Sequence, residues 1–239
     1  LVFAAAFAFG SFCLARYPSR PLSASGGTHP LRALRFVRED KLFRRTLVCW
    51  MLMGFANLMM IPMRVEYLAN PKYGLALSVG EIAFLTGVIP NVARLVLSPI
   101  WGWLFDRMNF FVLRLTLNLG FAIGIAAFFT SADVTGLVVG AVVFGISNAG
   151  GDVAWSLWVT KFAPAEQVAD YMSVHTSFTG LRGVLAPLVA FHVVKQLSIG
   201  MLGWISVGLI LASVLLLVPE IKYGRFGRRG GALVEEVSE

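Results

Sequence analysis

Charged residues are scarce in this sequence, and their scarcity excludes an ordinary water-soluble globular protein. Only 14% of the 239 residues are Asp, Glu, Lys or Arg, whereas 57% are hydrophobic and the mean hydropathy is +0.76. Soluble domains carry about 25% charged residues, because their surfaces must stay hydrated. We therefore expect most of the chain to lie in a lipid bilayer.

Cysteine and histidine are also rare, which argues against a disulfide framework, a metal centre and a membrane enzyme. Cys13 and Cys49 lie in or beside apolar runs, and their spacing matches no metal site. The histidines His29, His175 and His192 are scattered, whereas a membrane enzyme would need catalytic groups gathered near one interface. We predict no catalytic residue, no metal and no cofactor.

Acidic residues are outnumbered, 13 against 20 Lys and Arg, which gives a net charge of +7. Basic proteins often bind nucleic acid, but these cations gather in short segments between apolar runs and form no stripe on a soluble domain. Basic loops beside membrane spans have this distribution. The lipid bilayer is the expected partner, and nucleic acid is not.

Six apolar stretches are long enough to cross a membrane. A hydrocarbon core of ~30 Å requires ~20 helical residues, and only a helix lets one segment satisfy its own backbone hydrogen bonds in lipid. The stretches are 46–63, 79–105, 110–130, 135–160, 171–194 and 198–218. The expected fold class is therefore all-α, with a six-helix membrane bundle over residues 46–218.

The flanking segments and the cations predict an orientation. Residues 1–15 are apolar and have neither an initiator Met nor a basic n-region, so we interpret them as the remnant of a further membrane helix. Residues 16–45 form a basic loop, containing either an amphipathic helix on the inner leaflet or an ordinary charged linker. The loop and the tail 219–239 are rich in cations, which predicts that both ends are cytoplasmic in a plasma (inner) membrane.

The most specific motif follows the second span: Gly102-Trp-Leu-Phe-Asp106-Arg107-Met-Asn109. It resembles the glycine, aspartate and arginine signature of the major facilitator superfamily. Asn109 stands where that family usually has glycine, and the next two positions are Phe where it has basic residues. The resemblance is therefore to the weaker copy of the motif, between the eighth and ninth helices. The Gly180 to Pro187 stretch, which includes Gly183, is similar to the glycine and proline pattern of the family's fifth helix in each half, where small residues permit close helix packing and a kink.

The resemblance implies that the chain runs from the end of the family's sixth helix through its twelfth. The family has two six-helix halves around a central cavity, with inverted repeats inside each half. The N-terminal half of the same polypeptide would then be a partner. The first, second, fourth and fifth spans would line the cavity or the contact between halves, and the third and sixth would face lipid.

The motif after the second span predicts a gating loop made of Gly102, Asp106 and Arg107. Glycine lets two helices approach, and a carboxylate at a helix end can cap a neighbouring helix or pair with an arginine. Such contacts would break and re-form as two bundles rock. The alternative is an Asp-Arg pair that only anchors the loop.

Polar residues inside the spans are candidate substrate or coupling residues, because charge in a membrane is costly. His175, Thr179 and Arg182 share one face of the fifth span, and Arg182 should lie near the midplane, where it binds an anionic group or pairs with a buried carboxylate. Asn57 lies near the midplane of the first span. Near the outer boundary the sequence predicts an external gate or a snorkelling cluster, formed by Arg64, Glu66 and Glu81.

The fourth span carries the best candidate for proton coupling. Asn148, Asp152 and Trp155 form a polar face, and a carboxylate buried in a membrane can exchange a proton near neutral pH. Arg94 on the second span lies at a depth similar to that of Asp152. An Arg94–Asp152 pair that only neutralises both charges is the alternative.

The leading functional hypothesis is a secondary active transporter, a symporter or antiporter that moves a small-molecule substrate by alternating access. A proton gradient is the candidate driving force. The rivals are a non-transporting membrane sensor or scaffold of the same fold and a polytopic membrane enzyme.

Overall fold

The computed structural model describes residues 2–16, 32–161 and 163–222, and all regular structure in these ranges is helical. The chain divides into two compact units, Leu1–Arg32 and Ala33–Glu239. The first contains α1 (Val2–Ala15), an apolar helix with exposed Phe7 and Phe9. Residues 17–31 of the predicted basic loop and residues 223–239 of the predicted tail lie outside the described residues.

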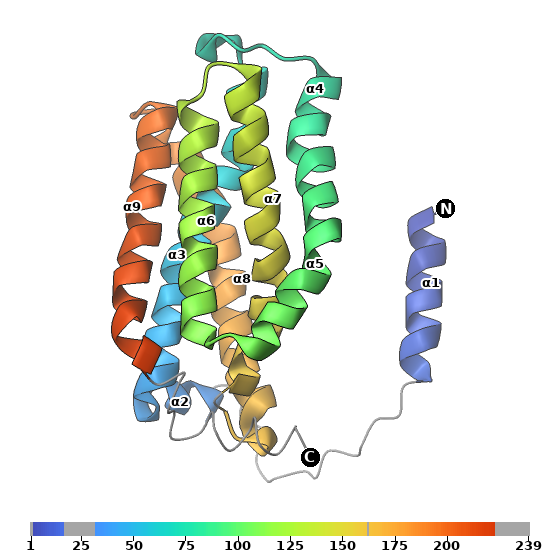
Figure 1. Ribbon diagram of the computed structural model, residues 1–239, viewed down its shortest axis with the longest axis vertical. Helices are drawn as coiled ribbons and strands as arrows, with labels where there is room; N and C mark the ends of the chain where they lie inside the picture. Colours follow the sequence, from blue (N-terminus) through green and yellow to red (C-terminus); the bar gives the residue numbers. More distant parts are fainter. Residues whose placement is uncertain (1, 17–31, 162, 223–239) are drawn as a thin grey trace. The chain divides into compact units, whose positions relative to one another are not determined.

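The second unit contains a helix for each of the six predicted spans (Figure 1). These are α3 (Lys41–Ala69), α4 (Val79–Ala83) continued by the π-helix η3 (Phe84–Val88) and α5 (Ile89–Arg107), α6 (Phe110–Thr130), α7 (Val134–Leu157) continued by η4 (Trp158–Lys161), α8 (Val168–Val193) and α9 (Ile199–Leu217). Five of the described helices are long and apolar enough to cross a membrane. α8 is not among them, because its hydroxyl, histidine and arginine side chains lower its hydropathy.

Short polar residues begin the helices by accepting hydrogen bonds from free backbone N–H groups. Asp40 accepts from Phe43 N at the start of α3, Asn109 starts α6, and Ser198 starts α9. The Asp40 cap makes α3 begin at Lys41, before the predicted start at residue 46. The last residues of the predicted basic loop are therefore the first turns of α3.

The short helix α2 (Arg35–Glu39) precedes α3 and packs against the bundle. The Phe36 ring stacks on Tyr171 of α8 with 4.4 Å between ring centroids, and the Tyr171 hydroxyl donates to Asp40 at 3.2 Å. Phe43 is also buried, against Trp158. The aromatic side chains of this basic segment thus pack on the protein itself.

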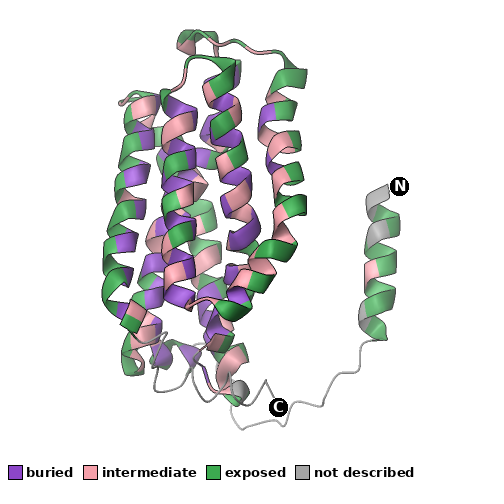
Figure 2. Cartoon of the chain, in the orientation of Figure 1, coloured by how far each residue is buried: buried purple, intermediate pink, exposed green. Residues whose placement is uncertain are grey.

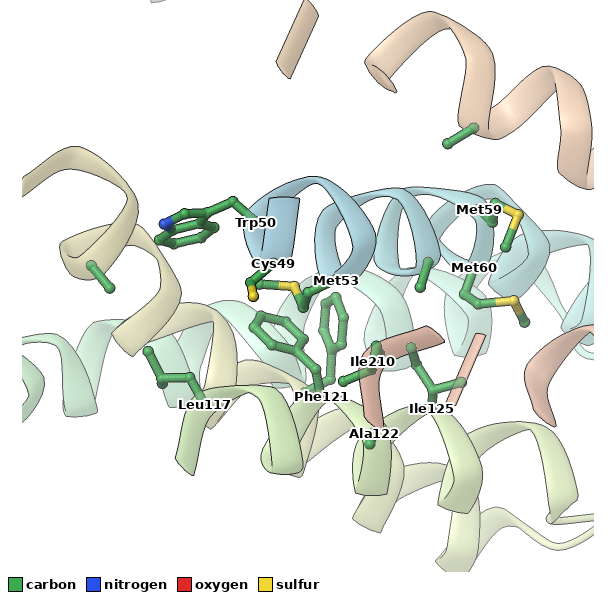
Figure 3. Packing of buried hydrophobic residues seen from close by; sticks show 14 of the residues in the cluster. Cys49, Trp50, Met53, Met59, Met60, Leu117, Phe121, Ala122, Ile125 and Ile210 are labelled. Atoms are coloured by element: carbon green, nitrogen blue, oxygen red, sulfur yellow. The ribbon is translucent and has the colours of Figure 1, made fainter. Parts of the chain in front are cut away.

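The core of the bundle forms where α3 meets α6, α8 and α9, while α7 packs between α5 and α6. Figure 3 shows Met53 and Met60 of α3 beside Phe121 and Ile125 of α6 and Ile210 of α9. Methionine fills irregular gaps between helices because its side chain is unbranched and flexible. Apolar packing therefore fixes α3, α6 and α9 as the framework on which the other helices lie.

Glycine permits the closest helix contacts, but not at the positions that the sequence suggested. A Cβ on Gly140 of α7 would lie 2.7 Å from Phe128 N of α6, and one on Gly145 would lie 2.7 Å from Pro90 O of α5. A Cβ on Gly102, Gly180 or Gly183 would meet no atom of the described chain within 4 Å. The expectation that Gly180 and Gly183 allow close packing is wrong within this bundle, because they lie on an exposed face of α8.

The second span and α8 form the open side of the unit. In the apolar window of Val79–Arg107 only 11% of residues are buried, against 44–56% in the other four candidate spans. Leu95 of α5 and Val184 and Leu188 of α8 are among the exposed apolar residues. Figure 2 shows α5 mostly in green and pink, the colours of exposed and partly buried residues. Both helices therefore present an uncovered apolar face.

Candidate functional site

Polar and aromatic residues of four helices converge in the half of the bundle where α3 begins. We call this group the central cluster. It consists of Trp50 on α3, Arg114 on α6, Trp155 and Trp158 on α7 and η4, and His175 and Arg182 on α8. Arg94 and Asp152 form a separate ion pair on the open side, between α5 and α7.

His175 lies among three tryptophan rings. Its ring centroid is 5.6 Å from that of Trp50, 5.5 Å from Trp155 and 5.3 Å from Trp158. The imidazole is fully buried, and neither ring nitrogen has a hydrogen-bond partner in the described chain. The tryptophans therefore fix the position of a polar ring that retains its hydrogen-bonding capacity.

Arg182 reaches from α8 to the backbone of α3. Its Nη1 donates a hydrogen bond to the carbonyl oxygen of Trp50, and its guanidinium lies against Gly54, where any Cβ would overlap it. Its Nε has no hydrogen-bond partner among the described residues. Glycine at position 54 thus makes room for the Arg182 guanidinium. The N–H groups of that guanidinium that do not bond to Trp50 remain available to donate hydrogen bonds to another group.

Arg114 is a charged residue of the cluster that the sequence reasoning missed. It is fully buried, with Cζ 3.3 Å from the centroid of the Trp50 ring, and none of its three guanidinium nitrogens finds a hydrogen-bond partner in the described chain. Cys49, Arg182 and His175 are close enough to interact with its charge. The available signal was a lone arginine in an apolar span, followed by Asn118 on the same helix face.

Arg94 and Asp152 form the ion pair that their matched depths predicted as the alternative to proton coupling. The side chains are 48% and 49% exposed, so the pair lies on the surface of this unit and outside its packed core. Exposed ion pairs contribute little to folding, ~0–1 kcal/mol. The pair is therefore free to break without unfolding the bundle.

The remaining central candidates lie on α3, α7 and α8, three of the four helices that form the cluster. Asn57 Oδ1 on α3 and Thr179 Oγ1 on α8 are buried atoms without a hydrogen-bond partner among the described residues. Asn148 is half-buried on α7, one turn before Asp152. These side chains add neutral hydrogen-bonding groups beside the charged ones.

The predicted outer group does not assemble. Arg64 is buried, with Cζ 3.2 Å from the centroid of the Phe144 ring and 5.3 Å from that of Phe128, so it is neither an interfacial snorkelling residue nor bonded to the predicted glutamates. An aromatic face stabilises a guanidinium by cation–π attraction, which explains how this position accepts it.

The two glutamates of that group have local partners instead. Glu66 forms an ion pair with Lys72 at 3.7 Å. Glu81 accepts a hydrogen bond from the Ser78 hydroxyl at 2.7 Å and completes the capping box of α4. Both carboxylates thus interact with residues at their own helix ends, and in the described chain neither contacts Arg64 to form the predicted gate.

The loop between α5 and α6 shows why Asn109 replaces a glycine. Its Oδ1 accepts from Phe111 N at 2.9 Å to cap α6, and its Nδ2 donates to Ile221 O at 2.8 Å. Asp106 and Arg107 are exposed, and Asp106 is close enough to Lys161 to act on its charge. The loop is thus tied to the 3-10 turn Val218–Lys222 that follows α9, and it lies near the end of η4.

Comparison with known proteins identifies one relationship. The model of a family described as Major Facilitator Superfamily matches residues 67–232, from the end of α3 to beyond α9. No curated protein and no solved structure matches the chain.

Proposed function

Because the chain belongs to the major facilitator superfamily, we propose that it is one half of a secondary active transporter that moves a small solute by alternating access. The chain is an integral membrane protein of a transporter family. The observation that carries the proposal is the central cluster, since polar groups buried among membrane helices are costly and mark substrate or ion pathways.

The open faces of α5 and α8 support a two-half arrangement. Both helices leave apolar side chains and glycines uncovered, at Leu95 and Gly102 on α5 and at Gly180 and Leu188 on α8. Another membrane bundle, the N-terminal half of the same polypeptide, would cover these faces. The Arg94–Asp152 pair and the partly exposed edge of the cluster would then lie between the halves.

The ion pair is the proposed coupling element. Protonation of Asp152 would release Arg94, and deprotonation would restore the pair, so that proton binding changes the charge on the face between the halves. Solute and protons then move together or in exchange.

Proton movement is measured with the full-length protein in proteoliposomes loaded with a pH-sensitive dye. The solutes tested are a panel of sugars, amino acids, amines and organic acids. At least one solute should move protons faster than in protein-free liposomes, and no response to any solute would favour a sensor or scaffold.

Orientation is tested with introduced cysteines. Positive loops face the cytoplasm, and α3 begins, α5 passes into α6 and α7 passes into α8 at one cation-rich end of the bundle (Figure 1). In a background with Cys13 and Cys49 changed to Ser, Lys72→Cys should react with an impermeant maleimide on intact cells. Arg38→Cys should react only after lysis. The reverse pattern would contradict a cytoplasmic location of both chain ends in the plasma membrane.

Asp106→Asn should slow the conformational cycle without weakening substrate binding. The residue is exposed at the end of α5, beside the loop to α6 and near Lys161, so its charge acts on loop contacts. We expect the maximal transport rate to fall about tenfold, which corresponds to ~1.4 kcal/mol in the barrier. Glu39→Gln, an exposed change on α2, serves as the control. Loss of equilibrium binding by a folded Asp106→Asn protein would contradict this role.

A further inference from the structure

We propose that the transported solute is an organic anion, and that Arg182 binds its charged group while Trp155 contacts its apolar part. This inference rests on the proposed transport function, and it assigns a substrate class to the central cluster. The chemistry recognised is a planar or tetrahedral oxyanion, such as a carboxylate or sulfonate, joined to an apolar body.

The balance of charge inside the bundle is the first argument. Of the arginines near the cluster, Arg94 has Asp152 as its partner, while Arg114 and Arg182 pair with no carboxylate in the described chain. Glu220, the buried carboxylate of the described chain, pairs with Arg45. Two guanidinium groups therefore share an apolar interior without a counter-charge. Their combined positive charge favours an opposite charge, which an anionic solute supplies.

The geometry of Arg182 is the second argument. The bond from Nη1 to Trp50 O and the space at Gly54 hold the fork in place, so little side-chain freedom is lost when a ligand binds. Nε remains without a partner, as does the hydroxyl oxygen of Thr179 one turn earlier on α8. A guanidinium fork beside a hydroxyl donor matches the oxygens of a carboxylate or sulfonate.

The tryptophans indicate where the rest of the solute lies. Trp50 and Trp158 are buried and already packed on His175, whereas Trp155 is only partly buried beside the same histidine. Its ring therefore offers an apolar surface next to the cationic groups. A cationic solute would meet repulsion from Arg114 and Arg182, and a neutral one would leave both charges unmatched.

A binding measurement tests the substrate class without requiring transport. The purified full-length protein is heated with pairs of compounds that share a shape and differ in charge: acetate and acetamide, hexanoate and hexanamide, benzoate and benzamide. At least one carboxylate should raise the melting temperature, while its amide does not. Stabilisation by amides alone, or by none of the six, would overturn the inference. If sugars or amines drive proton movement in proteoliposomes, transport stands and the anion inference falls. If carboxylates bind but no solute moves protons, the cluster binds organic anions and the proposed proton-coupled transport is wrong.

Variants of Arg182 locate the site. Arg182→Gln should weaken binding of the stabilising carboxylate about 30-fold or more, the loss typical of one partner of a buried charge pair. Arg182→Lys keeps the charge but loses the fork, so it should fold normally and bind about tenfold more weakly. Arg38→Gln, the same change on the exposed surface of α2, should bind like the wild type.

A carboxylate of the protein's other half is the competing source of counter-charge. In that case Arg182→Gln would lower the melting temperature of the ligand-free protein and leave carboxylate affinity unchanged. That result, or unchanged affinity in both Arg182 variants, would overturn the assignment of Arg182 to the site.

Discussion

Asp152→Asn should abolish uptake driven by a proton gradient while preserving exchange of labelled for unlabelled solute across the membrane. Exchange needs no net proton movement, whereas accumulation under the proposed mechanism requires Asp152 to take up and release a proton while Arg94 is freed and recaptured. The measurement uses proteoliposomes with the solute identified by the proton-movement panel. It compares uptake under an imposed pH gradient with counterflow in its absence.

The static alternative for the ion pair predicts a different pattern. If Asp152 only neutralised Arg94, the single change would leave an unpaired cation and lower stability, and the double change with Arg94→Gln would restore expression and driven uptake together. Both side chains are about half exposed in this unit, so the stability loss should not exceed ~1 kcal/mol. Restored driven uptake in the double variant would remove Asp152 from the coupling mechanism.

Gly54→Ala should weaken solute binding about 10- to 100-fold in a folded protein. A methyl group at this position would overlap the Arg182 guanidinium and displace it from Trp50 O. The displaced guanidinium would lose its charge-assisted hydrogen bond to the solute, which contributes ~1.5–3 kcal/mol to binding. The guanidinium is the flexible end of a side chain, so the bundle should still form. Binding is measured by titration of the solute against the melting temperature.

Gly208→Ala on α9 is the matched control for that change. It is also a glycine-to-alanine substitution in a helix of the same bundle, but its Cβ would meet no described atom within 4 Å. We expect wild-type affinity. Equal weakening in both variants would indicate a general effect on helix packing, and unchanged affinity in Gly54→Ala would mean that Arg182 does not depend on this space.

The helices were predictable because length and apolarity are properties of each segment alone. Helix spacing placed His175, Thr179 and Arg182 on one face, and counting depth from opposite ends paired Arg94 with Asp152, as the structure has it. α8 shows the limit of hydropathy, since the residues that make it functionally interesting also make it less apolar.

The details that were missed depend on contacts between helices. Arg114 lies near the start of its span, where a long side chain usually snorkels to the interface, so only the fold reveals that it is buried on Trp50. The burial of Arg64 was missed for a similar reason, because its aromatic partners come from α6 and α7. The space that Gly54 provides for Arg182 is likewise a property of two packed helices.

Alternating access is tested most directly by thiol accessibility at Thr179, whose hydroxyl oxygen is buried beside the cluster on α8. In the full-length protein with its native cysteines replaced, Thr179→Cys is exposed to an impermeant maleimide in right-side-out and in inside-out vesicles. We expect Thr179→Cys to be labelled from both sides, more slowly when the transported solute is present, while Lys72→Cys reacts from the outside alone. Labelling of Thr179→Cys from one side only, or from neither, would contradict alternating access.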